Sequence, residues 1–187
     1  MFSGDVNFLI AMPSLKSDIF SNTVILMAEY NEKGALGFII NMPTGTTAQK
    51  LAKQMNIEHR QPLDIPILFG GPVETGYFWM IHSADFKGAS TIKVHDQFHL
   101  TAVQEIIPLL NDVKCPEIYY VGVGYSGWGE KQLDREIEEG SWWYGEFDPK
   151  ILFEGELDKR WEEAFKSLGA DPEHLIDLTD PMDPIIN

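Results

Sequence analysis

Short apolar segments separated by turn-forming residues constrain the fold of this chain most. Most are rich in β-branched and aromatic residues and shorter than an ordinary helix, which is typical of buried strands. We expect strands at Phe8–Met12, Thr23–Tyr30, Ala35–Asn41, Pro66–Phe69, Tyr77–His82, Thr91–Val94, Glu117–Val123 and Ser141–Phe147. The sequence Asn31–Gly34 between the second and third segments predicts a hairpin with a loop of about four residues.

Helical patterns are inserted irregularly among these strands. We expect helices from Thr46 or Thr47 to about Met55, from Thr101 (with Gln104 resembling a capping box) to Leu110, over Trp128–Glu139, and over Glu156–Leu168. Because strands and helices do not alternate regularly, the order predicts a single α+β domain with a mixed or antiparallel sheet. We assign residues 1–170 to this domain and residues 171–187 to an acidic, proline-containing C-terminal tail.

The charge of the chain is strongly negative and unevenly distributed. Its 187 residues carry a net charge of −15, and residues 101–187 contribute 20 acidic but only 7 basic groups. Binding to DNA or RNA depends largely on neutralising phosphates with Lys and Arg, and no cluster of basic residues occurs. We therefore expect no direct nucleic-acid binding and no attachment to anionic membranes. A basic protein partner or a neutral ligand remains open.

The compartment is inferred from the single cysteine and from the N-terminus. Cys115 has no second cysteine with which to form an intramolecular disulfide, and we expect it to be a buried or half-buried thiol. The N-terminus lacks a basic segment followed by a long apolar run, so it does not resemble a signal peptide. No apolar run approaches the roughly 20 residues needed to span a bilayer. We expect a soluble cytoplasmic protein.

Residues Gly122–Gly127 match the G-x-G-x-x-G pattern of dinucleotide-binding turns. The pattern follows an expected strand and precedes an expected helix, and Glu146 lies about 20 residues further on. However, the motif occurs late in the chain without a βαβαβ unit, and acidic residues at the start of the helix compete with a phosphate. We interpret it as a tight strand-to-helix turn in which glycine permits close backbone packing.

Other catalytic and metal-binding patterns are incomplete. Ser126 is not in a nucleophile elbow because Trp128 occupies the position of the second glycine, and the only later histidine is His174. His95 and His99 have the spacing of a zinc pair but lack the glutamate of H-E-x-x-H. We therefore predict no catalytic residues, no metal site and no cofactor.

Several short segments, taken in order, resemble the YqgE/AlgH family. The resemblance extends from about Phe8 to Gly169. It rests on Phe8–Pro13, Gly34–Pro43, Gly70–Val73, Gly124–Trp128 followed by Gln132-Leu133 and Glu136, Leu152-Phe153, and Trp161 through Leu168-Gly169. Each segment alone is weak, but their order and spacing are specific. The chain departs from the usual pattern near Gly140-Ser141, where family members often carry Asn before the Trp.

The resemblance implies a fold and a cellular context. It implies a compact α+β domain with a bent, partly barrel-like mixed sheet and flanking helices, in a bacterial cytoplasmic protein. The family is often labelled a transcriptional regulator through one member tied to alginate production. It has no established catalytic residues that could be transferred to this chain.

Two functional hypotheses follow. The first is a non-enzymatic regulatory or protein-interaction module that acts through a protein partner and not by direct DNA binding. The alternative is a small-ligand-binding protein or an unrecognised enzyme whose site lies where the glycine-rich turns meet, since ligands approach the backbone closely at glycine. The residues predicted for that site are Asn41, Gly70, Gly71, Tyr125, Ser126, Gly127 and Trp128.

Overall fold

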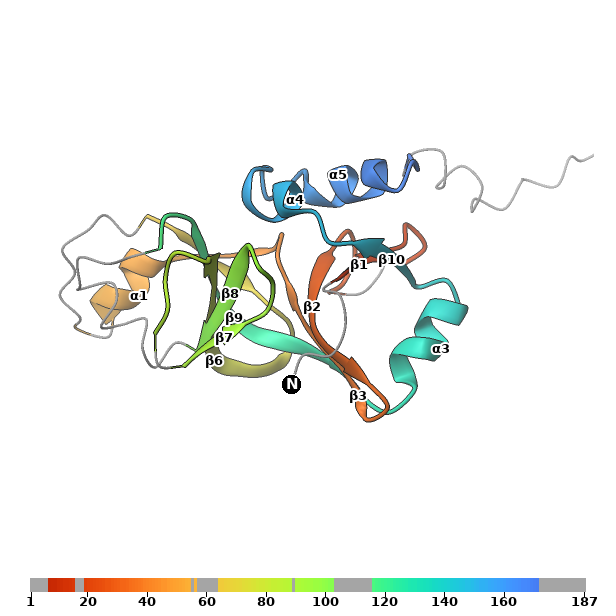
Figure 1. The fold of residues 1–187 in the computed structure, drawn as a ribbon, viewed down its shortest axis with the longest axis horizontal. Coiled ribbons are helices and arrows are strands. Elements are labelled where there is room, and N and C mark those ends of the chain that lie inside the picture. The colour runs from red at the N-terminus through yellow and green to blue at the C-terminus, as the bar shows by residue number, and fades with distance from the viewer. Residues whose placement is uncertain are drawn as a thin grey trace, which may run out of the picture.

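The computed structural model describes residues 7–15, 19–54, 56, 64–88, 90–102 and 116–171 (Figure 1). Its ten strands form one mostly antiparallel sheet that curls into a half-barrel, and four described helices surround it. The elements are β1 (Asn7–Ala11), β2 (Val24–Asn31), β3 (Gly34–Ile39), β4 (Pro43–Thr47), α1 (Ala48–Gln54), β5 (Pro66–Phe69), β6 (Val73–Ser83), β7 (Thr91–Lys93), β8 (Phe98–Ala102), β9 (Tyr119–Trp128), α3 (Gln132–Glu138), β10 (Trp142–Glu146), α4 (Pro149–Phe153) and α5 (Arg160–Ser167).

Strand β9 joins the two halves of the sheet. The strand order is β10-β1-β2-β3-β9-β6-β8-β7, with β4 paired to β5 and β5 paired in parallel to β9. β9 pairs with β5 through residues 121–123 and with β3 through residues 126–128, while β6 pairs with it over residues 119–125. The expected single α+β domain with a bent mixed sheet is therefore confirmed.

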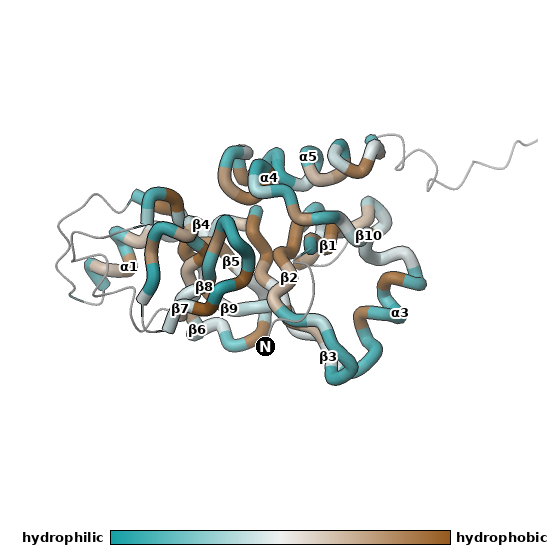
Figure 2. The backbone as a smooth tube through the Cα atoms, in the orientation of Figure 1, coloured by the Kyte–Doolittle hydropathy of each residue, from teal (hydrophilic) through white to brown (hydrophobic). Residues whose placement is uncertain are grey.

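Both faces of the β1–β2–β3 region are covered, which explains why its strands read as continuous apolar runs. Phe8 and Ile10 belong to a core cluster shared with α4 and α5, whereas Leu9 and Ala11 belong to a second cluster that includes Leu133 of α3. Figure 1 shows the α4–α5 segment and α3 on different sides of these strands. In Figure 2 the hydrophobic stretches follow the central strands and the β2–β3 turn is hydrophilic.

Two adjacent side chains anchor α5 to the sheet. Nε1 of Trp161 donates a hydrogen bond of 2.8 Å to the carbonyl oxygen of Ala11. The guanidinium of Arg160 is fully buried, donates to the carbonyl oxygen of Ile40 and lies 4.4 Å from the centre of the Tyr120 ring. Burial lowers the pKa of Arg160 from its ordinary value. These contacts fasten the last described helix across the ends of β1 and β3.

The structure corrects the expected turn at Gly122–Gly127. These residues, together with Trp128, lie within strand β9, and the helix begins only at Gln132. These residues remain part of the sheet because β3, β5 and β6 supply hydrogen-bond partners along both edges of β9. Within the strand, Gly124 has a φ of +72°, a left-handed conformation that glycine permits. The strand-to-helix turn required for a dinucleotide fingerprint is therefore absent at this motif.

Two further expectations are wrong in detail, and others lie outside the described residues. The β2–β3 hairpin has a two-residue loop because Asn31 pairs directly with Gly34. Thr101 does not cap a helix; it lies in β8, where its hydroxyl bonds to His82 and Thr91. The helix expected after Thr101, Cys115 and the tail beyond residue 171 lie outside the described part of the chain. By contrast, the predicted cap of α1 is confirmed, since the Lys50 N–H donates to Oγ1 of Thr47.

Candidate functional site

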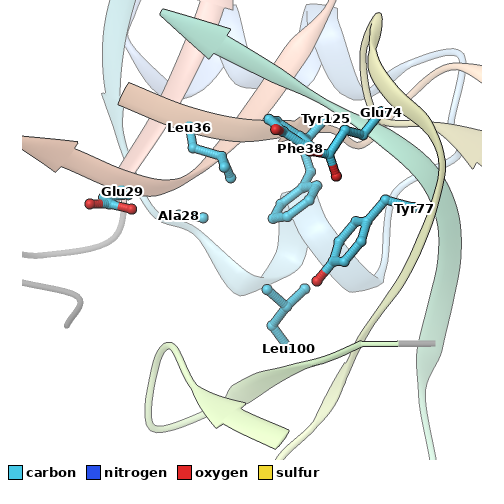
Figure 3. Close-up of a pocket in the computed structure, with 8 residues that line it drawn as sticks. All are labelled: Ala28, Glu29, Leu36, Phe38, Glu74, Tyr77, Leu100 and Tyr125. Carbon is cyan, nitrogen blue, oxygen red and sulfur yellow. The ribbon is translucent and has the colours of Figure 1, made fainter. Parts of the chain in front are cut away.

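A hollow of about 300 Å³ lies between the two halves of the sheet (Figure 3). Side chains from β2, β3, β6, β8 and β9 line it. The apolar members are Ala28, Leu36, Phe38 and Leu100, and the polar members are Glu29, Glu74, Tyr77 and Tyr125. The volume is at the lower end of the range for ligand pockets, and it is sufficient for one large side chain or a small molecule.

Two irregularities of strand pairing frame this hollow. Between β2 and β3 the register shifts from Met27 to Glu29, so that Ala28 is an extra residue. Between β6 and β9 the register shifts from Val73 to Phe78, and the intervening residues lie opposite a single residue of β9. β-Bulges redirect side chains and occur next to functional sites more often than elsewhere. The bulged segments are the ones that bring Glu29, Glu74 and Tyr77 to the hollow.

One end of the hollow combines two phenol rings with the carboxylate of Glu74. The rings of Tyr77 and Tyr125 meet edge to face, with centroids 6.4 Å apart and an interplanar angle of 88°. Figure 3 shows Glu74 beside Tyr125 and Glu29 at the opposite end. Burial raises the pKa of Tyr125, and the negative charge of Glu74 raises it further. Tyr125 therefore remains a protonated phenol at neutral pH, and none of the eight lining residues is basic.

The backbone segments of the predicted site do meet. A Cβ atom added to Gly70 would lie 2.3 Å from the carbonyl oxygen of Gly124, and one added to Gly71 would lie 2.3 Å from the carbonyl carbon of Tyr125. The N–H of Gly70 donates to the carbonyl oxygen of Val123 at 2.8 Å. The carbonyl oxygen of Gly70 also accepts a hydrogen bond from the N–H of Ile39, so both polar backbone atoms of Gly70 are hydrogen-bonded to neighbouring strands.

The predicted side chains have different positions. The side chain of Asn41 accepts a hydrogen bond from the N–H of Val24 and donates one to the carbonyl oxygen of Asn22, so it fixes the backbone at the start of β2. Ser126 is fully buried and donates to the carbonyl oxygen of Gly70 at 3.0 Å.

Tyr125 is the predicted residue that also lines the hollow. Gly127 is exposed beside it, where an added Cβ would lie 3.7 Å from the Tyr125 ring. Ligand binding by the other predicted residues stays a prediction.

Trp128 belongs to a hydrogen-bonded clamp around Glu136. Oε2 of Glu136 accepts hydrogen bonds of 2.8 Å from Nε1 of both Trp128 and Trp142, and Oε1 accepts one of 2.9 Å from Nε2 of Gln132. The indole rings of the two tryptophans meet edge to face at 5.9 Å. This clamp ties the end of β9 to α3 and β10, which gives Trp128, Gln132 and Glu136 a structural role.

A second polar cluster lies between β6, β7 and β8. His82 is fully buried, with Nδ1 2.8 Å from the carbonyl oxygen of Ser83 and Nε2 2.9 Å from Oγ1 of Thr101. Because a carbonyl only accepts, we place the proton on Nδ1, and Nε2 then accepts from the Thr101 hydroxyl. Thr101 in turn accepts from Thr91 at 2.7 Å, and Thr91 accepts from the N–H of Gly88. Burial lowers the pKa of His82, consistent with a neutral ring.

Within the ranges that the structure describes, no group of three or more His, Cys, Asp or Glu side chains is arranged to hold a metal ion. In the same ranges, no helix combines the length and the apolar character needed to cross a membrane.

Sequence reasoning missed seven of the eight lining residues of the hollow. Tyr125 is identifiable from the sequence because it lies in a glycine-rich motif. Glu74 and Tyr77 follow Gly70-Gly71, but no spacing marks the bulge that redirects them. Glu29 reads in the sequence as an ordinary solvent-facing strand residue. The feature that would identify these lining residues is the shift in strand register, and this shift is defined only after the strands have paired.

Comparison with known proteins places this architecture in a family. A family model described as AlgH-like matches residues 8–173. UPF0301 proteins of Photobacterium profundum and Vibrio atlanticus are 34% and 36% identical over 175 residues, which cover 90% of this chain and 94% of each relative. The solution structure of the AlgH protein from Pseudomonas aeruginosa superposes with a TM-score of 0.75 at 28% identity, covering 98% of this chain and 99% of that one.

A crystal structure of a protein from Corynebacterium diphtheriae has the same fold. It has a TM-score of 0.66 at 16% identity and covers 89% of this chain and 88% of that chain. The family match extends over nearly all the described residues, and it includes the strands that frame the hollow and the Glu136 clamp. The chain therefore belongs to the AlgH-like UPF0301 family, whose function is unknown.

Proposed function

We propose that this protein is a non-enzymatic protein-interaction module with a regulatory role, and that its partner docks at the hollow. The observation that carries the proposal is the hollow itself, with an apolar floor and exposed tyrosine at its rim. Tyr77 is 39% exposed, while Phe38 beneath it is buried. Binding hot spots combine aromatic residues with pockets into which a partner side chain inserts.

The size and lining of the hollow support docking of a partner side chain. About 300 Å³ is small for a dinucleotide or another large cofactor. The lining groups are apolar side chains, phenols and carboxylates. The pKa of Tyr125 lies above its ordinary value because of burial and the neighbouring Glu74, with which its hydroxyl forms a hydrogen bond, so the phenol stays protonated at neutral pH and is not a base.

A regulatory role would be exerted through protein contacts. The net charge of −15 repels the phosphate backbone of nucleic acids, and direct DNA binding relies on neutralising those phosphates. The acidic surface instead favours encounter with a positively charged protein partner. We therefore place any influence on transcription at the level of a protein complex.

Site-specific photo-crosslinking tests the docking proposal. A photoreactive phenylalanine analogue is placed at Tyr77, and a matched one at Tyr144, an equally exposed tyrosine of β10 that does not line the hollow. We expect a discrete protein adduct in native cells from position 77 but not from position 144. The partner, identified by mass spectrometry and purified, should bind at least about tenfold more weakly to Tyr77→Ala than to the wild type or to Tyr144→Ala. Equal binding to all three proteins would contradict the proposal.

Small-ligand binding is a second candidate. One observation favours it: Tyr125, which belongs to the site predicted from the sequence, also lines the hollow. A ligand that raises the melting temperature of the wild-type protein should have no effect on Tyr125→Leu. A shift that persists in this variant would place the ligand elsewhere.

A further inference from the structure

We propose that the hollow receives the cationic end of an arginine side chain from a basic segment of the partner, with Glu74, Tyr77 and Tyr125 as its recognition groups. This inference rests on the docking function proposed above and specifies the chemistry of the partner. It assigns the polar end of the hollow to the guanidinium and the apolar floor to the methylene stem.

Charge selects a cation. The hollow contains two carboxylates, those of Glu29 and Glu74, and none of its lining residues is basic. The whole chain is also strongly acidic. A neutral or anionic occupant would cover these carboxylates without supplying a counter-charge, which is unfavourable. A guanidinium offers a planar set of N–H donors that matches a carboxylate.

The aromatic geometry favours the same occupant. The rings of Tyr77 and Tyr125 meet edge to face near Glu74, so a side chain that reaches this carboxylate also meets aromatic rings. A cation is attracted to the face of an aromatic ring, and arginine makes this contact more often than lysine. Since the pKa of Tyr125 is raised, its ring is not converted to phenolate, and the cation is recognised by ring face and carboxylate together.

The floor of the hollow fits the rest of the side chain. Leu36, Phe38 and Leu100 form an apolar surface next to the tyrosines. Long basic side chains bury their methylene groups against such surfaces while their charged ends reach polar groups. Glu29 adds a second carboxylate at the far end of the hollow, and Nδ2 of Asn31 already donates a hydrogen bond to it, so Glu74 is the principal partner of the guanidinium.

Titration with short peptides tests this chemistry. The probe is a blocked pentapeptide with a central arginine between alanines, and its matched control carries citrulline, which has the same shape without the charge. Binding to the full-length protein is followed by NMR amide shifts up to about 10 mM peptide, because a single exposed cationic contact gives weak binding. We expect shifts around the hollow with the arginine peptide, at least about fivefold weaker binding of the citrulline peptide, and weakening with salt.

Variants locate the contact. Glu74→Gln and Tyr125→Leu should each weaken binding of the arginine peptide by about fivefold or more. Glu29→Gln is a second charge variant and should weaken binding less. Glu32→Gln, in the β2–β3 turn outside the hollow, is the matched control and should bind as the wild type does. Amide spectra of each free variant verify that the fold is retained.

Several outcomes would overturn the inference while leaving the docking function intact. Equal binding of the citrulline peptide would show that charge is not recognised, and an absence of shifts with either peptide would remove the arginine site. Methylguanidinium that binds as tightly as the peptide would make the occupant a small cation. The crosslinking partner could still bind through Tyr77 in each case, whereas failure of the crosslinking test would reject docking itself.

Discussion

Gly122 and Gly127 lie in the same strand, yet alanine substitution should destabilise the protein strongly at Gly122 and hardly at all at Gly127. A Cβ atom added to Gly122 would lie 2.0 Å from Cζ2 and 2.3 Å from Cη2 of Trp79. An ordinary contact is at least 3.4 Å, so the overlap exceeds an ångström. Trp79 has little room to move, because it is fully buried, its Nε1 donates to the carbonyl oxygen of Gly124 at 2.7 Å, and its ring lies 4.9 Å from that of Phe38.

The expected magnitudes follow from these surroundings. Overpacking a well-packed core costs about 1–3 kcal/mol, and because Trp79 is held in place we expect Gly122→Ala to lose about 3 kcal/mol of unfolding free energy. At Gly127 an added Cβ would make only ordinary contacts, the nearest at 3.7 Å. Alanine there also restricts the unfolded chain, so the free energy of unfolding should change by less than about 1 kcal/mol.

Guanidinium chloride unfolding, followed by tryptophan fluorescence and far-ultraviolet circular dichroism, measures the difference. The midpoints are compared provided that the slopes agree. If Gly122→Ala is too unstable to measure, Trp79→Phe in the same chain removes the clashing ring atoms and should restore part of the loss. A Gly122→Ala variant as stable as the wild type would refute the packing argument, as would an equal loss at Gly127.

Two other perturbations test the polar clusters. Glu136→Ala removes the acceptor of three hydrogen bonds at a partly exposed site, and we expect the free energy of unfolding in urea to decrease by about 2–3 kcal/mol. Glu136→Gln should lose less, and an unchanged midpoint of Glu136→Ala would show that the clamp does not contribute to stability. Burial lowers the pKa of His82 in the folded state, so as the pH falls below about 6.5 the unfolded chain binds a proton before the folded chain does. The free energy of unfolding is therefore highest above pH about 6.5, and it decreases as the pH falls from there toward the lowered pKa of folded His82. Unfolding measured from pH 7 to 5 should show this slope, and His82→Gln should reduce it; an identical slope in the variant would assign the effect to other groups.

Much of the secondary structure is predictable because it follows from local pattern. Contiguous apolar runs such as Phe8–Met12 and Thr23–Tyr30 correspond closely to β1 and β2, since a strand buried on both faces has no polar alternation. The cap at Thr47 is predictable because a side-chain oxygen needs only a nearby N–H. The overall negative charge follows from composition alone.

The glycine-rich motif shows where local pattern becomes ambiguous. Glycines at positions 122, 124 and 127 suit a tight turn, but they equally suit a strand against which other groups pack closely. The second arrangement exists because Trp79 occupies the space above Gly122 and the carbonyl oxygen of Gly71 lies against Gly124. Nothing near the motif in sequence indicates these two contacts, so the strand assignment depended on the tertiary structure.

The candidate site divides in the same way. The sequence by itself indicated most of the segments that become strands, that the chain is acidic, and that Tyr125 lies in an unusual glycine-rich segment. Only the tertiary structure decided the strand registers, and with them the bulges that bring Glu29, Glu74 and Tyr77 around one hollow. The physical reason is that a shift of one residue in register reverses the face on which a side chain lies. That register is set by pairing and packing between strands distant in sequence, which no local pattern records.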